Sequence, residues 1–140
     1  MRMFNIEIEP FINFLMELEL PAKQSRMRTR FCKLGIERLK LLEEEKMEII
    51  KKHGNIDENG EVKQVKDEQG RLVWDIKDKD GFNADYKELM MEEWVLDLNE
   101  EKKDMLLTLK DSVLNLDITL KGKEALQYDR WCEIVEQIKY

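Results

Sequence analysis

The chain has 140 residues, of which 42% are apolar and 39% are charged, and its formal net charge is −7. This length suits one domain with a buried core, and the apolar content excludes a chain that is disordered throughout. The negative charge argues against nucleic acid or an anionic membrane as a default partner.

The basic residues are concentrated in one segment. Residues 21–40 contain seven basic residues and one acidic residue, a net charge of +6, whereas the rest of the chain has 17 basic and 30 acidic residues, a net charge of −13. Cys32 and Cys132 form no CxxC motif, and no apolar run approaches the ~18–20 residues of a membrane span. Because no signal peptide is recognisable at the N-terminus, we expect a cytoplasmic protein with reduced thiols.

The N-terminal residues predict a strand followed by a helix. Phe4, Ile6 and Ile8 alternate with polar residues, as in a short strand. Pro10 suits the first turn of a helix, and Pro21 would end that helix. The apolar residues between the two prolines recur at helical spacing, at Phe11, Phe14, Leu15 and Leu18.

A second, longer helix is predicted over residues 23–52. This segment contains no proline and a single glycine, Gly35, and its apolar residues form a roughly helical stripe. His53 would end the helix, and Gly54 would follow it at a position where glycine often takes a left-handed conformation. A helix of about 30 residues is about 45 Å long. Because that exceeds most small cores, part of the helix is expected to project or to meet a partner.

Residues 55–98 predict a β-containing insertion. Turn signals rich in Asp and Gly lie at 57–60, 67–70 and 78–81, and short segments rich in β-branched and aromatic residues lie between them, at 62–65 and 72–76. This pattern is typical of a β-hairpin with a four-residue loop. A short helix is expected from about Asn83, and residues 94–98 are expected to form a third strand, with a helix as the alternative.

The C-terminal residues predict a second helical hairpin. Asn99 is a suitable N-cap for a helix, and Gly122 separates this helix from a last one that ends near residue 139. We therefore predict a mainly α fold (α+β) and a single domain over residues 1–140. The helical hairpins 9–53 and 99–139 would form a four-helix-type bundle. Residues 55–98 would be inserted between them as a hairpin or three-stranded sheet around 60–98.

Two segments of the chain match at an offset of 100 residues. Leu20, Lys23, Arg30 and Cys32 recur as Leu120, Lys123, Arg130 and Cys132. One interpretation is a duplicated helical hairpin, and the other is chance similarity between two amphipathic segments.

No constellation of residues predicts an enzyme or a cofactor. His53 is the only histidine, and its place at a helix end beside the negative pole of the dipole explains it without catalysis. Two distant cysteines and one histidine do not have the spacing of zinc ligands, and the Asp/Gly turns lack the full calcium loop. No glycine-rich phosphate loop is present. Cys32 and Cys132 each follow an aromatic residue and are expected to be buried as small apolar residues.

The candidate binding residues are the basic cluster of the long helix. It consists of Lys23, Arg26, Arg28, Arg30 and Lys33. Arg26 and Arg30 can share one face of a helix, while Arg28 must point elsewhere. Pairing with acids of this chain or of a partner protein, contact with nucleic-acid phosphates, and a neutral solvated surface all remain open for this cluster.

Three segments of the sequence resemble an uncharacterised protein family. They are INFL at 12–15, LPAKQSRMRTRF at 20–31 and EALQYDRWCE at 124–133. The family they resemble is a domain of unknown function found in phages and prophages of Gram-positive bacteria. The resemblance implies a phage origin and a small accessory protein, but it implies no activity and no functional residues.

These observations favour a small non-enzymatic phage protein that acts by protein–protein interaction in the host cytoplasm. It would be an assembly accessory or an inhibitor of a host defence or host enzyme, bound to a host or virion protein or to itself. A homodimer is suggested by three apolar residues expected to be exposed, Met90, Met91 and Trp94. The alternatives are a nucleic-acid-binding accessory protein that uses residues 23–33 and an acidic mimic of nucleic acid.

Overall fold

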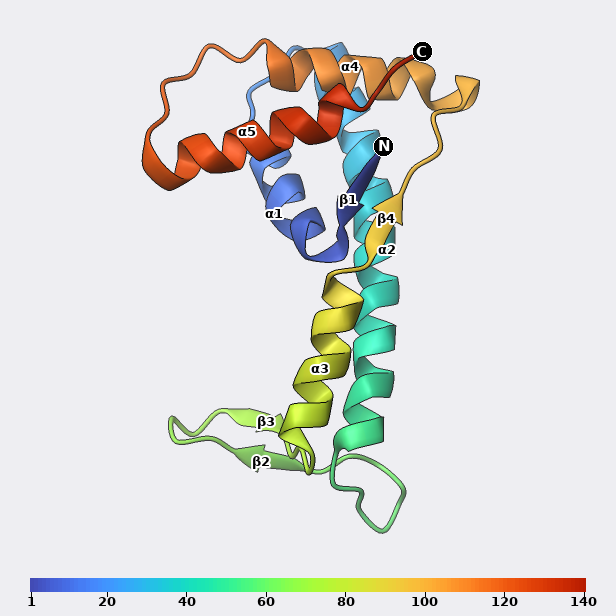
Figure 1. Cartoon of the computed structure of the whole chain (residues 1–140), viewed down its shortest axis with the longest axis vertical. Coiled ribbons are helices and arrows are strands. Elements are labelled where there is room, and N and C mark those ends of the chain that lie inside the picture. Colours follow the sequence, from blue (N-terminus) through green and yellow to red (C-terminus); the bar gives the residue numbers. More distant parts are fainter. The chain divides into compact units, whose positions relative to one another are not determined.

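The computed structural model describes all residues, 1–140, and is mainly helical, with two small antiparallel sheets of two strands each (Figure 1). The predicted α+β class is therefore confirmed. The chain divides into two compact units. The terminal unit consists of Met1–Leu39 and Glu93–Tyr140, and the middle unit consists of Lys40–Glu92. The division falls within one long helix, α2 (Ala22–His53). The middle unit thus begins well before the insertion predicted at residues 55–98.

The terminal unit begins with a strand that ends sooner than predicted. Strand β1 (Arg2–Phe4) pairs antiparallel with β4 (Glu93–Val95), and helix α1 (Asn5–Met16) follows directly. The predicted strand through Ile6 and Ile8 is wrong, because both residues lie in α1. The Glu7 carboxylate accepts the backbone N–H of Phe4 at 2.9 Å and so satisfies a free donor at the helix start.

Aromatic side chains from three helices fill the core of the terminal unit. The ring of Phe11 in α1 lies 4.9 Å from that of Trp131 in α5 (Gly122–Glu136) and 5.8 Å from that of Phe31 in α2. All three rings are at most 1% exposed, and burial of each stabilises the fold by roughly 1.5–3 kcal/mol. Helix α4 (Lys103–Leu114), which follows the short 3₁₀ helix η1 (Glu100–Lys102), adds buried residues to this unit.

Helix α1 packs closely against α2 at Gly35. A Cβ atom at this position would lie 2.6 Å from Cδ1 of Ile12, so a larger residue would force Ile12 to move. The single glycine inside the long helix therefore permits the two helices to pack closely.

The middle unit contains the C-terminal half of α2, a β-hairpin and helix α3 (Lys79–Met90). Strands β2 (Gln64–Lys66) and β3 (Leu72–Trp74) confirm the predicted hairpin. Asp67 holds its loop, because the carboxylate accepts the backbone N–H groups of Gln69 and Arg71 at 2.9 Å each.

Three local predictions for the middle of the chain are wrong. The segment 78–81 is not a turn: the Asp78 carboxylate accepts the N–H of Gly81 and caps α3, which begins before Asn83. Strand β4 pairs with β1 and not with the hairpin, so no three-stranded sheet forms. Gly54 does not take a left-handed conformation but pairs with Ile76 in an isolated bridge.

Candidate functional site

Arg28 is bound within the terminal unit. Its Nη1 donates to the backbone carbonyl of Leu15 at 2.9 Å and also to that of Leu18, and its Nη2 donates to Oγ of Ser25 at 2.8 Å. Leu15 lies in the last turn of α1 and Leu18 lies just beyond its end, where carbonyls lack the N–H groups of a following turn. The guanidinium therefore joins the end of α1 to α2, and its charge is not presented to a partner.

The other four residues of the predicted cluster lie on one exposed side of α2. Lys23, Arg26, Arg30 and Lys33 follow each other at steps of three or four residues and are all exposed. We call these four residues the basic face. The Lys23 ammonium lies 3.9 Å from the Asp104 carboxylate, whereas no ion pair or hydrogen bond involves the side chain of Arg26, Arg30 or Lys33.

Helix polarity adds to the positive charge of the basic face. The first turn of α2 contains no acidic residue, so no side chain of that turn offsets the positive end of the helix dipole. Arg26 and Arg30 are four residues apart, a spacing at which like charges destabilise a helix by about 0.2–0.5 kcal/mol. An acidic group from outside the chain would remove this repulsion.

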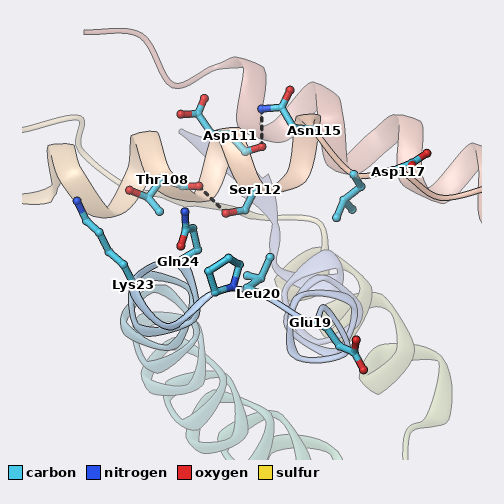
Figure 2. A pocket seen from close by; sticks show the side chains of 11 residues that line it. Glu19, Leu20, Lys23, Gln24, Thr108, Asp111, Ser112, Asn115 and Asp117 are labelled. Atoms are coloured by element: carbon cyan, nitrogen blue, oxygen red, sulfur yellow. Dashed lines mark hydrogen bonds between the residues drawn. The ribbon is translucent and has the colours of Figure 1, made fainter.

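A polar hollow of about 440 Å³ lies at the N-terminal end of the basic face (Figure 2). It is bounded by the α1–α2 loop, the start of α2, α4 and the residues after α4. Its lining includes Lys23 together with the carboxylates of Glu19, Asp111 and Asp117. Two other polar groups of the lining bond to their own helix: Oγ of Ser112 donates to the Thr108 carbonyl at 2.8 Å, and Nδ2 of Asn115 donates to the Asp111 carbonyl at 2.9 Å. The Ser112 hydroxyl thus donates to a backbone carbonyl and not to one of these carboxylates.

An apolar groove runs between α1 and α5. It consists of two adjoining hollows, of about 320 and 530 Å³, that share Pro10, Gln127 and Trp131. Trp131 forms its buried floor, and Ile6 and Leu126 on its rim are 55% and 75% exposed. The groove is therefore a second exposed surface of the terminal unit that differs in chemistry from the basic face.

An ion pair lies at one end of this groove. The Arg130 guanidinium donates to both carboxylate oxygens of Glu7, at 2.6 and 2.9 Å. Burial alone would raise the pKa of the Glu7 carboxyl, but the bonds from Arg130 and from the Phe4 N–H hold this pKa below its ordinary value. The same ion pair raises the pKa of Arg130, so both groups are charged at neutral pH.

His53 ends α2, as predicted, and it binds two carboxylates that the sequence did not reveal. Its Nε2 lies 2.7 Å from Oδ2 of Asp85 in α3, and its Nδ1 lies 3.5 Å from Oδ2 of Asp78. Lys52 donates to the same Asp85 oxygen at 2.9 Å. The hydrogen bond from His53, followed by that from Lys52, holds the pKa of the Asp85 carboxyl below its ordinary value. No hydroxyl or thiol forms a hydrogen bond with these side chains, which link two helices of the middle unit.

The two cysteines are free thiols. Cys32 is 2% exposed, which confirms the predicted burial, and desolvation raises the pKa of its thiol to about 11. A thiol with this pKa is protonated at neutral pH and is a poor nucleophile. Cys132 is partly exposed, so its predicted burial is wrong. It lies close enough to Tyr128 to add to the effect of burial in raising the pKa of that phenol to about 12.

The apolar residues expected to support a dimer are only partly exposed. Met91 is 48% exposed, but Met90 and Trp94 are half-buried. The Trp94 ring lies 6.0 Å from the ring of Phe31, so Trp94 belongs to the core of the terminal unit. The prediction that Met90 and Trp94 are exposed is therefore wrong.

No protein-family model, no curated protein and no solved structure matches the chain. The resemblance to a phage family therefore stays a prediction. No helix combines the length and the apolar character that crossing a bilayer requires. No group of three or more histidine, cysteine or acidic side chains is arranged to hold a metal ion.

Proposed function

We propose that this chain is a non-enzymatic binding protein whose basic face docks onto an acidic surface of a protein partner. It would act in the cytoplasm of a bacterial host as a phage accessory protein, either in assembly or as an inhibitor of a host defence or host enzyme. We also propose that the helices of the terminal unit pack as a four-helix-type bundle that holds the basic face in place.

One observation carries the proposal. Three cations at positions i, i+4 and i+7 of α2, namely Arg26, Arg30 and Lys33, are exposed and unpaired in a chain that has 31 acidic residues. Other exposed cations of the chain, such as Lys87 and Lys121, are also unpaired, but these three share one side of a single helix within eight residues. An acidic partner surface would gain charge-assisted hydrogen bonds from two arginines. Complementary charge also speeds the encounter and fixes the register of the two proteins.

The charge distribution favours a protein partner over nucleic acid. The basic face spans eleven residues of helix, a rise of about 15 Å, whereas the chain outside residues 21–40 has a net charge of −13. A long polyanion would meet this acidic remainder as well as the basic face, whereas a partner with one acidic patch would meet the basic face alone.

The proposal is tested by affinity capture from Gram-positive bacterial lysate with three forms of the tagged full chain. They are the wild type, the triple variant Arg26→Ala/Arg30→Ala/Lys33→Ala, and the control Lys87→Ala/Lys121→Ala/Lys139→Ala. The control also removes three exposed, unpaired cations. We expect a protein that the wild type and the control retain after nuclease treatment and that the triple variant loses. Loss of all capture on nuclease treatment, or equal capture by the three forms, would contradict the proposal.

A further inference from the structure

The β2–β3 hairpin of the middle unit exposes apolar side chains. All six strand residues are exposed, including Leu72 at 64%, Val73 at 40% and Trp74 at 37%. The hairpin extends away from α3 and the adjoining end of α2 (Figure 1). A two-stranded hairpin is marginally stable in water unless further strands or a helix pack against it. A hollow of about 490 Å³ separates Val73 and Trp74 from Phe82 of α3, so α3 covers these side chains only in part.

Strand β3 has a free backbone edge. The backbone N–H of Asp75 donates to the Lys63 carbonyl at 2.8 Å, and that of Asp67 donates to the Arg71 carbonyl at 2.9 Å. Because bonded pairs alternate with non-bonded pairs in an antiparallel ladder, the odd-numbered residues of β3 face β2. The N–H and C=O groups of Leu72 and Trp74 consequently point outward, to the side where no strand is paired.

The two outer edges of the hairpin differ in their side chains. In β2, the residues whose backbone N–H and C=O groups point outward are Gln64 and Lys66. An exposed lysine on an edge strand discourages pairing with another strand. In β3, these residues are Leu72 and Trp74, whose uncharged side chains do not discourage pairing. Of the two edges, that of β3 is therefore the one suited to accept a further strand.

We propose that this edge pairs with β3 of a second copy of the chain, antiparallel and centred on Val73, to form a four-stranded sheet. In this register Leu72 lies opposite Trp74 of the second copy, and their outward N–H and C=O groups exchange two hydrogen bonds at each of two symmetry-related positions. Val73 lies opposite Val73 of the second copy. The interface is its own complement, as a closed twofold dimer requires.

The charges that flank β3 support pairing with a second copy. In the register centred on Val73, Arg71 of each copy lies opposite Asp75 of the other. Arg71 donates through Nε to Asp67 and through Nη2 to Gln69, and Asp75 accepts from Asn55 at Oδ2, so Nη1 and Oδ1 are available for the new pair. Two ion pairs thus close the ends of the shared ladder. An unrelated strand would match this order of charges only by chance.

The first test is the mass of the full chain by size exclusion with multi-angle light scattering. We expect a rise from 16.9 kDa towards twice that value between about 5 and about 500 µM. A constant monomer mass over this range would overturn the proposal and leave the edge to a strand from another protein.

A pair of proline variants locates the interface. Leu72 and Lys66 lie opposite each other in the hairpin, and each has an outward N–H, so Leu72→Pro and Lys66→Pro each remove a donor that the hairpin itself does not use. We expect Leu72→Pro to weaken the dimer at least about tenfold and Lys66→Pro to leave it unchanged, with circular dichroism confirming that both variants fold. Equal effects of the two variants on dimerisation would overturn the proposal.

A charge exchange tests the register itself. Arg71→Asp and Asp75→Arg each place like charges opposite each other in the proposed homodimer, and both variants should be monomeric at concentrations where the wild type is dimeric. An equimolar mixture restores Asp opposite Arg at both ends and should form a heterodimer. Homodimers of either variant, or a mixture that stays monomeric while the wild type dimerises, would overturn the register.

Discussion

Glu7 and Arg130, which are 123 residues apart in the sequence, form a two-pronged ion pair that joins α1 to α5. Both side chains are at least partly buried, with 15% and 34% of their surface exposed. Glu7 also accepts the Phe4 N–H at the start of α1. One carboxylate therefore connects the start of the first helix to the last helix.

We expect Arg130→Ala to lower the free energy of unfolding by about 1–3 kcal/mol, because it leaves a partly buried carboxylate without its charged partner. Glu7→Gln should cost a similar amount. The double variant should cost less than the two single losses added together, because the two groups interact directly. Urea denaturation of the four forms measures this coupling, and strictly additive losses would show that the ion pair contributes nothing.

A second prediction separates Arg28 from the basic face. Arg28→Ala should destabilise the chain by about 1–3 kcal/mol, because the carbonyls of Leu15 and Leu18 lose their donor. Arg30→Ala should change stability by less than about 0.5 kcal/mol, because Arg30 is exposed and makes no bond. Thermal unfolding of the two variants compares them. A larger loss for Arg30→Ala than for Arg28→Ala would reverse the roles assigned to these residues.

Whether Gly35→Ala lowers or raises the stability of the chain should depend on Ile12. Gly35→Ala should destabilise the wild type by about 1 kcal/mol, because crowding of Ile12 outweighs the better helix propensity of alanine. In an Ile12→Val background, which lacks the Cδ1 atom, the same change should be neutral or stabilising. Denaturation midpoints of the four forms test this reversal. An equal loss in both backgrounds would show that contact with Ile12 is not the reason for the glycine.

The Asp85 carboxyl predicts a dependence of stability on pH. Its pKa is lowered in the folded chain, so its contribution is present above the ordinary pKa of aspartate and is lost as the pH falls through the lowered value. The Tm of the wild type should therefore fall more than that of Asp85→Asn between about pH 6 and about pH 3. Parallel Tm profiles of the two proteins would show that the bond with His53 does not stabilise the middle unit.

Local sequence signals predicted elements better than they predicted what those elements contact. The alternation of Phe4, Ile6 and Ile8 fitted a strand, but Ile8 also begins the helical series of buried residues that continues through Phe11 and Ile12. The Glu7 carboxylate favours the helix over the strand, because it accepts the Phe4 N–H at the start of α1. Similarly, a strand near Trp94 was predicted, but its pairing with β1 joins segments about 90 residues apart and has no local signal.

The sequence predicts the candidate binding residues as a basic cluster, but it only partly predicts what each residue of the cluster contacts. Helical spacing separated Arg28 from Arg26 and Arg30, but it did not show that Arg28 bonds to the end of α1. The segment that matches at an offset of 100 residues contains a similar contact. Tyr128, at the position equivalent to Arg28, donates to the Val113 carbonyl in α4 at 2.6 Å. Both residues thus bond to the C-terminal part of the preceding helix, a parallel that residue identity alone does not reveal.

The proposed function depends on contacts of Arg26, Arg30 and Lys33 with an acidic protein partner. The most direct measurement is the dissociation constant of the wild type and the triple alanine variant with the purified captured protein, at about 50 and about 300 mM salt. We predict that salt weakens wild-type binding at least about tenfold and that the variant at low salt binds no better than the wild type at high salt. An affinity that neither salt nor the triple substitution changes would contradict docking through the basic face.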